Sequence, residues 1–126
     1  MTCHVLVVDD DDDLRESLGD ALAVTGHVVT TASDGAVALR TLEGGARPGL
    51  ILLDLMMPVM DGYAFRAAQL ADARWRDIPV VVLTAHADIA AIAAQLQPSA
   101  VHRKPIELRR LQGVVAEHCA GPAASS

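Results

Sequence analysis

Short apolar runs recur along the chain, and segments with helical spacing separate them. The clearest run is Leu50–Leu53, which leads directly into Asp54 and lies between Pro48-Gly49 and Pro58. A short continuous apolar run between turn residues is typical of a fully buried strand. We therefore expect Asp54 at the end of a buried parallel strand. Taken alone, this segment also fits an aspartate that only caps a turn.

The same pattern predicts five strands and five helices. The strands are expected at residues 4–8, 27–32, 50–54, 79–84 and 100–103. The helices are expected at about 14–25, 34–42, 61–70, 89–96 and 108–118. In the third helix, the spacing of Tyr63, Ala67 and Leu70 indicates the apolar face. Regular alternation of strands and helices predicts an α/β fold with a parallel sheet covered on both faces and right-handed crossovers.

Composition narrows the class of protein. The 126 residues suffice for one domain, and with 52% hydrophobic but only 2% aromatic residues the core must be aliphatic. The net charge of -6 argues against a nucleic-acid-binding surface. There is no apolar run near the ~18 residues of a membrane span and no signal peptide, so we expect a cytoplasmic protein without membrane contact. In that compartment the two cysteines, Cys3 and Cys119, are interpreted as free thiols.

Polar residues stand at the ends of four of the predicted strands. They are Asp9 and Asp10, Asp54, Thr84, and Lys104, the only lysine among ten basic residues. A parallel sheet brings such strand ends to one edge, where ligands bind in open α/β folds. Clustered carboxylates suit Mg²⁺, and an ammonium adds a point charge for phosphate oxygens. This combination favours phosphoryl transfer to an aspartate.

The acidic run Asp9–Asp13 has two interpretations. It is a solvated acidic turn in which Asp11 or Asp12 caps the next helix, or part of it meets a cation. Capping accounts for Asp11 to Asp13, whereas Asp9 and Asp10 fall at the buried end of the first strand. We therefore expect these two aspartates to belong to the cluster at the sheet edge.

The motifs together resemble the CheY-like receiver domain of bacterial two-component response regulators. They are Val7-Val8-Asp9-Asp10, Asp54 with Met57-Pro58 and Asp61-Gly62, Thr84-Ala85, and Lys104-Pro105. The resemblance covers residues 4–119 and leaves 120–126 as a flexible C-terminal tail. It implies a flavodoxin-like, doubly wound, five-stranded parallel sheet with strand order 2-1-3-4-5.

The resemblance also implies roles for individual residues. Asp54 would be the phospho-acceptor. Asp10 would ligate Mg²⁺ directly and Asp9 through water, and Asp54 and the backbone carbonyl of Met56 would complete the protein ligands.

Two further residues would act on the phosphoryl group itself. Lys104 would pair with the phosphoryl oxygens, from a cis Lys104-Pro105 bond, and Thr84 would hydrogen-bond the attached group. The donor would be a histidine kinase or a histidine phosphotransfer protein. The protein would not be an enzyme beyond its own phosphorylation and autodephosphorylation.

The sequence departs from the family pattern in three places. Val101 replaces the usual Tyr or Phe, which puts the usual coupling between Thr84 and the surface in question. Gln97-Pro98 replaces a Gly-Ala turn, so the fourth helix is expected to be trimmed or shifted. Ile106 stands where Phe is common. His86 has two interpretations, an exposed residue or one that orients the hydrolytic water.

We thus expect a single-domain response regulator. It would signal to a downstream protein through the fourth helix, fifth strand and fifth helix. One alternative is a degenerate receiver that binds its partner constitutively. A second is a phosphohydrolase resembling haloacid dehalogenases, with Asp9 of an Asp9-x-Asp11 motif as nucleophile.

Overall fold

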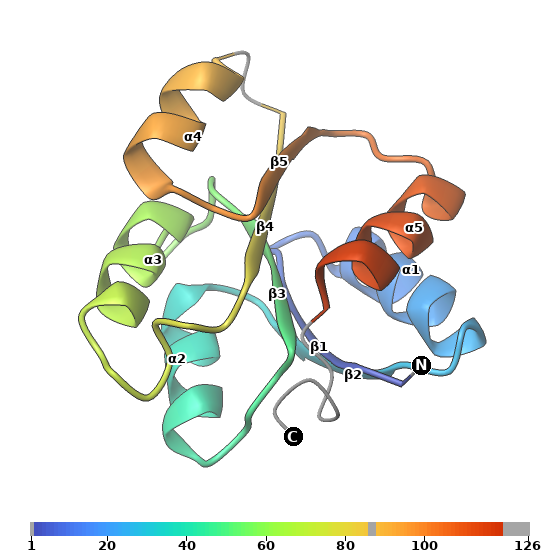
Figure 1. The fold of residues 1–126 in the computed structure, drawn as a ribbon, viewed down its shortest axis with the longest axis horizontal. Helices are drawn as coiled ribbons and strands as arrows, with labels where there is room; N and C mark the ends of the chain where they lie inside the picture. The colour runs from blue at the N-terminus through green and yellow to red at the C-terminus, as the bar shows by residue number, and fades with distance from the viewer. Residues whose placement is uncertain (1, 86–87, 120–126) are drawn as a thin grey trace.

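The computed structural model describes residues 2–85 and 88–119, which form one parallel sheet between two layers of helices (Figure 1). The strands are β1 (His4–Val8), β2 (Val28–Ala32), β3 (Leu50–Asp54), β4 (Val80–Thr84) and β5 (Ala100–Arg103). The helices are α1 (Asp12–Val24), α2 (Gly35–Glu43), α3 (Gly62–Leu70), α4 (Ile89–Leu96) and α5 (Leu108–His118). The strand order β2-β1-β3-β4-β5 confirms the predicted topology.

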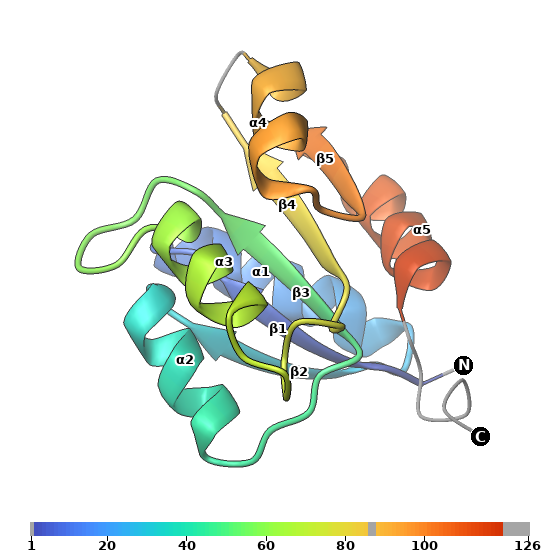
Figure 2. The ribbon, with the colours of Figure 1, turned by 60° about the vertical axis from the view of Figure 1, so that its left-hand side comes forward.

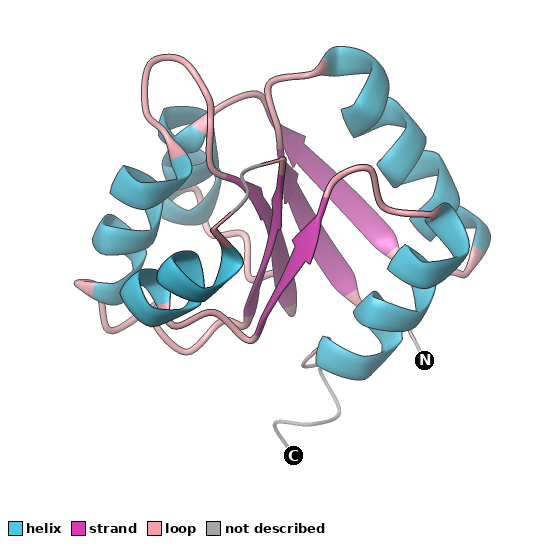
Figure 3. Cartoon of the chain, turned by 90° about the horizontal axis from the view of Figure 1, so that it is seen from above, coloured by secondary structure: helices cyan, strands magenta, loops and turns pink. Residues whose placement is uncertain are grey.

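The helices divide between the two faces of the sheet. Helices α1 and α5 cover one face, and α2, α3 and α4 cover the other (Figures 1 and 2). Successive strand residues point to opposite faces, so Leu50 and Leu52 join the core under α1 and α5, while Ile51 and Leu53 join the other core. All of β3 is buried, as its continuous apolar run predicts. Figure 3 shows the sheet enclosed on both sides.

Aspartates begin four of the helices. In each case the side chain accepts a hydrogen bond from the backbone N–H three residues later, which satisfies a donor left open at the helix start. The capping residues are Asp11, Asp34, Asp61 and Asp88. Helix α4 has eight residues, and its C-cap residue Gln97 lies in the left-handed region. Among the described residues, no helix is long and apolar enough to cross a membrane.

The predicted apolar face of α3 is wrong. Leu70 is 43% exposed, and the residues that α3 buries include Phe65, Arg66 and Gln69. Arg66 and Gln69 are polar, so hydrophobic periodicity does not place them inside. They are buried because hydrogen bonds satisfy them: the Arg66 guanidinium donates to Gln69 Oε1 at 2.8 Å, and Gln69 donates to backbone carbonyls.

The interpretation of the cysteines as free thiols is also wrong. Cys3 and Cys119 form a disulfide, with their Cα atoms 6.4 Å apart. Cys3 precedes β1 and Cys119 follows α5, so they are 116 residues apart in the sequence. Packing of α5 beside β1 brings them together, and neither their spacing nor their local sequence indicates this contact.

Candidate functional site

The predicted site residues meet at the carboxyl edge of the sheet. Asp9 follows β1, Asp54 ends β3, and Thr84 ends β4; their exposed fractions are 2%, 7% and 0%. Lys104 follows β5, where its backbone N–H donates to the Thr84 carbonyl at 2.8 Å. Asp10, by contrast, is exposed, although we expected it at the buried end of the strand. The chain turns outward after Asp9, so Asp10 lies at the rim of the site.

Lys104 connects the two buried carboxylates. Its Nζ atom donates to Asp9 Oδ2 at 2.7 Å and lies 3.4 Å from Asp54 Oδ1. A single ammonium thus neutralises part of the charge that β1 and β3 bring to this edge. Its side chain is 18% exposed, so the cluster is partly shielded from water and its charges interact more strongly than surface charges do.

The surroundings raise the pKa of Asp54 and also that of Lys104. Burial raises the pKa of the Asp54 carboxyl, and the neighbouring Asp9 charge adds to this, while the charge of Lys104 and a hydrogen bond from the Met56 N–H oppose it. Burial by itself lowers the pKa of Lys104. The hydrogen bond to Asp9 and the charges of Asp54 and Asp9 outweigh it, so the net pKa of Lys104 is raised. The ammonium therefore stays protonated over the physiological pH range.

Asp9 is held by contacts on several sides. Its Oδ1 atom accepts the Asp11 N–H at 2.9 Å, Oδ2 accepts Lys104, and its backbone carbonyl accepts Arg15 Nη1 at 2.7 Å. Sequence reasoning missed Arg15, and its position one helical turn after the cap Asp11 is the only signal that could have indicated it. These contacts hold both carboxylate oxygens of Asp9 in place.

The acidic residues fit a hard cation. Asp9, Asp10 and Asp54 each offer an oxygen, and these three oxygens all lie within 4.8 Å of one another. Oxygen donors of this kind are what Mg²⁺ takes, together with several waters. Met56 is 65% exposed, and its backbone N–H donates a hydrogen bond to Asp54.

The loop after β3 packs α3 directly against Asp54. The Gly62 N–H donates to the Leu55 carbonyl at 2.9 Å. A Cβ atom on Gly62 would lie 2.5 Å from the Asp54 carbonyl oxygen and 2.8 Å from Leu55 Cα, closer than real contacts allow. Glycine is therefore required here by the close approach of two backbones, which explains the Asp61-Gly62 motif.

The remaining predicted features lie around this cluster. The Lys104-Pro105 peptide bond is cis, as the resemblance implied. Val101 is half-buried and packs against the core beneath α4, and Ile106 is half-buried against the opposite core. His86 lies outside the described residues.

Sequence comparison with known proteins identifies a family and several relatives. The family model of the response regulator receiver domain matches residues 5–116. The transcriptional regulatory protein PrrA of Mycobacterium tuberculosis is 44% identical over 97 residues, which are 77% of this chain and 40% of PrrA. The probable transcriptional regulator ycf27 of Guillardia theta is 40% identical over 68% of this chain and 32% of its own length. The chain thus spans well under half the length of these curated relatives.

Solved structures agree with the sequence comparisons. The chemotaxis protein CheY4 of Vibrio cholerae superposes with a TM-score of 0.85 at 27% identity, over 94% of this chain and 99% of that protein. The receiver domain of a signal transduction histidine kinase from Syntrophus aciditrophicus gives a TM-score of 0.83 at 30% identity, over 91% and 88% of the two chains. With the family match over residues 5–116 and this shared fold, the chain belongs to the response regulator receiver domain family of two-component signalling.

Proposed function

We propose that this receiver domain, residues 4–119, accepts a phosphoryl group on Asp54 in a Mg²⁺-dependent reaction. The observation that carries the proposal is the cluster at the sheet edge. There Lys104 Nζ lies 3.4 Å from Asp54 Oδ1, and the oxygens of three aspartates lie within 4.8 Å of one another. A buried carboxylate beside a cation site and a fixed ammonium provides positioning and charge neutralisation, which are the main requirements of phosphoryl transfer.

The reaction assigns a step to each residue. An Asp54 carboxylate oxygen attacks the phosphorus of a phosphohistidine, the new O–P bond forms, and the P–N bond breaks with release of the imidazole. Lys104 pairs with a phosphoryl oxygen, and the Thr84 hydroxyl donates to another. The bound Mg²⁺ would supply charge neutralisation, with Asp10 as a direct ligand, Asp9 acting through water, and Asp54 and the Met56 carbonyl as the other protein ligands. Water later hydrolyses the acyl phosphate and restores Asp54.

The proposed donor is a histidine kinase or a histidine phosphotransfer protein, and the proposed compartment is the cytoplasm. The proposed receiver of the signal is another protein, which contacts the face formed by α4, β5 and α5. Phosphorylation would bias this face between two states. The net charge of -6 favours a protein over a nucleic acid as the partner of this domain.

Intact mass after incubation with acetyl phosphate and Mg²⁺ tests the proposal. The wild type should gain one phosphate, Asp54→Asn should gain none, and chelation of the metal should abolish the gain. Asp61→Asn is the matched control, because Asp61 is an exposed cap of α3 outside the cluster and its loss should leave phosphorylation intact.

Two other outcomes would reject the proposal. Phosphate uptake that survives in Asp54→Asn would mean that another residue is the acceptor. A wild type that takes up no phosphate, and binds its partner equally well with or without Asp54→Asn, would indicate a constitutive binding module. The presence of Val101 favours this constitutive binding function as the second candidate. Val101 replaces the Tyr or Phe that usually couples Thr84 to the surface in this family.

A further inference from the structure

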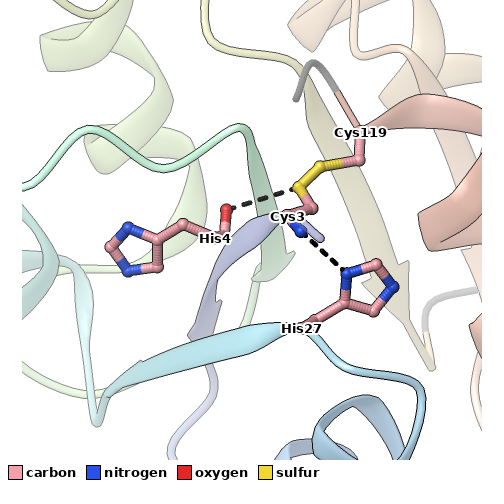
Figure 4. The surroundings of a disulfide bond; sticks show 4 residues. All are labelled: Cys3, His4, His27 and Cys119. Atoms are coloured by element: carbon pink, nitrogen blue, oxygen red, sulfur yellow. Dashed lines mark hydrogen bonds between the residues drawn. A yellow bond between two sulfur atoms is a disulfide. The ribbon is translucent and has the colours of Figure 1, made fainter. Parts of the chain in front are cut away.

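The disulfide joins two terminal parts of the domain, on the face that α5 covers. Cys3 lies just before β1, and Cys119 follows the last residue of α5 (Figure 4). A domain of this size with two aliphatic cores does not need a covalent link to fold, unlike small disulfide-rich domains. The proposed compartment is also one where persistent disulfides are rare. A purely structural role therefore explains this bond poorly.

The surroundings of the two sulfur atoms suit the reduced state as well. Cys3 Sγ lies 3.6 Å from the His4 carbonyl oxygen, which would accept the S–H of a Cys3 thiol (Figure 4). The Cys3 backbone N–H donates to His27 Nδ1 at 3.1 Å, so the backbone at Cys3 is held independently of the disulfide. Both cysteines also pack against the apolar core on this face, where a thiol behaves as a small hydrophobic group.

The two cysteines differ in exposure. Cys3 is 1% exposed, whereas Cys119 is only partly buried. A cavity of about 290 Å³ adjoins the bond, and its lining includes Cys3, His27, Gln112 and Cys119. This space lies between the loop after α1 and the last turns of α5. A small thiol can therefore approach the bond from the cavity, and Cys119, as the less buried of the two residues, is the expected point of attack.

We propose that Cys3 and Cys119 form a reversible thiol–disulfide site for low-molecular-weight thiols and disulfides of the glutathione type. In oxidation, the Cys119 thiolate attacks the glutathione disulfide and releases one glutathione, leaving a mixed disulfide on Cys119. The Cys3 thiolate then attacks Cys119 Sγ and releases the second glutathione. Two protein thiols are oxidised and one external disulfide is reduced. Reduction by two glutathione molecules reverses these steps, beginning at Cys119.

The bond fixes the C-terminal end of α5 to the start of β1. At its other end, α5 follows Lys104 by a short connection, and Gln112 Nε2 donates to the Ala21 carbonyl of α1 at 2.9 Å between the two ends. Oxidation therefore clamps one of the three elements of the proposed signalling face. This consequence for signalling rests on the proposed function, whereas the thiol chemistry does not.

The test uses the full chain in glutathione buffers at pH 7.5, without denaturant. After acid quench and alkylation, intact mass should show no added alkyl group in excess oxidised glutathione and two in excess reduced glutathione. The thermal midpoint should fall by about 10 °C on reduction, because a cross-link over 116 residues restricts the unfolded chain. Cys119→Ala should have the lower midpoint under both conditions.

Two single variants test the order of attack. Cys3→Ser should retain one glutathione on Cys119 as a stable mixed disulfide, and Cys119→Ser should take up none while folded. The proposal fails if wild type keeps two alkylatable thiols in excess oxidised glutathione. It also fails if the bond resists reduced glutathione until the protein is unfolded, or if Cys119→Ser takes up glutathione as readily as Cys3→Ser. None of these readouts requires phosphorylation of Asp54.

Discussion

Lys104 is bound more closely to Asp9 than to the proposed acceptor: its Nζ atom lies 2.7 Å from Asp9 Oδ2 and 3.4 Å from Asp54 Oδ1. The two residues of the shorter pair are 95 positions apart in the sequence and come from opposite sides of β3 in the sheet. Asp9 thus holds the ammonium beside Asp54 while leaving it within reach of an incoming phosphoryl group. We infer that Asp9 positions Lys104 in addition to its proposed role toward the metal.

Removal of the Lys104 charge should destabilise the fold in a pH-dependent way. Lys104→Met leaves two carboxylates close together without a cation, so the free energy of unfolding at pH 7 should fall by about 1–3 kcal/mol. The loss should shrink near pH 4, where protonation of a carboxyl relieves the repulsion. Urea unfolding followed by the fluorescence of Trp75, the only tryptophan and a buried one, measures both values. An equal loss at the two pH values would contradict this account.

The raised pKa of Asp54 predicts a second pH effect. A carboxyl whose folded pKa exceeds its unfolded value of 3.8 binds more protons in the folded state, so its contribution to stability is full below 3.8 and is lost as pH rises. Asparagine cannot ionise, so Asp54→Asn avoids the cost of a buried charge at this position. The variant should raise the free energy of unfolding at pH 7 by about 1 kcal/mol, with a smaller gain near pH 4. Lys104 does not contribute to the pH dependence of stability between pH 4 and 8, because its pKa is raised above the ordinary value of 10.5. Parallel stability curves for wild type and variant from pH 4 to 8 would refute the prediction.

Substitution of alanine for glycine should have opposite effects on stability at two positions, Gly62 in α3 and Gly113 in α5. Gly62→Ala should lower the free energy of unfolding by about 2–4 kcal/mol, because the new methyl group would meet the backbone of Asp54 and Leu55. Gly113→Ala in α5 should instead stabilise by about 0.5–1 kcal/mol, since nothing lies within 4 Å of its Cβ position and alanine favours helix. Denaturant titrations of both variants check the signs. Destabilisation by both would point to a general sensitivity to helix substitutions.

Hydrophobic periodicity and local sequence encode the parts of the fold that were predictable. The run from Leu50 to Asp54 specifies a buried strand with a carboxylate at its end, so the edge and its residues were predictable. The cap of the first helix was predicted as Asp11 or Asp12, and it is Asp11; this was predictable because an N-cap is a local feature. These parts of the fold depend on neighbours within a few positions in the chain.

The parts that were missed depend on distant contacts. The Cys3–Cys119 bond and the contact of Arg15 with the Asp9 carbonyl require the packed helices to be in place. The buried face of α3 was misassigned because Arg66 is satisfied by carbonyls that lie about 30 residues away. Polar residues enter a core only where such partners exist, and a single sequence does not show where the partners are.

Arg66 provides the last prediction, because it ties α3 to the end of α4. Its Nε donates to the Leu96 carbonyl at 3.0 Å and its Nη2 to the Gln97 carbonyl at 2.9 Å, at the terminus where α4 carries partial negative charge. Helix α4 buries only two residues, Ile92 and Leu96, so this polar contact is a large part of its attachment. Arg66→Met should lower the free energy of unfolding by about 2–4 kcal/mol, because it leaves the buried Leu96 carbonyl and the buried Gln69 Oε1 without this donor.

The effect should also be local to α4. Amide hydrogen exchange in α4 should accelerate in Arg66→Met more than exchange in α2, because the hydrogen bonds of Arg66 go to Leu96, Gln97 and Gln69 and not to α2. Arg76→Met, at an exposed arginine of the following loop, should change neither exchange nor stability appreciably. If Arg66→Met lowered global stability but left α4 no faster to exchange than α2, Arg66 would be a general core residue. If α4 alone loosened, the guanidinium would be the contact that holds this element of the proposed signalling face in place.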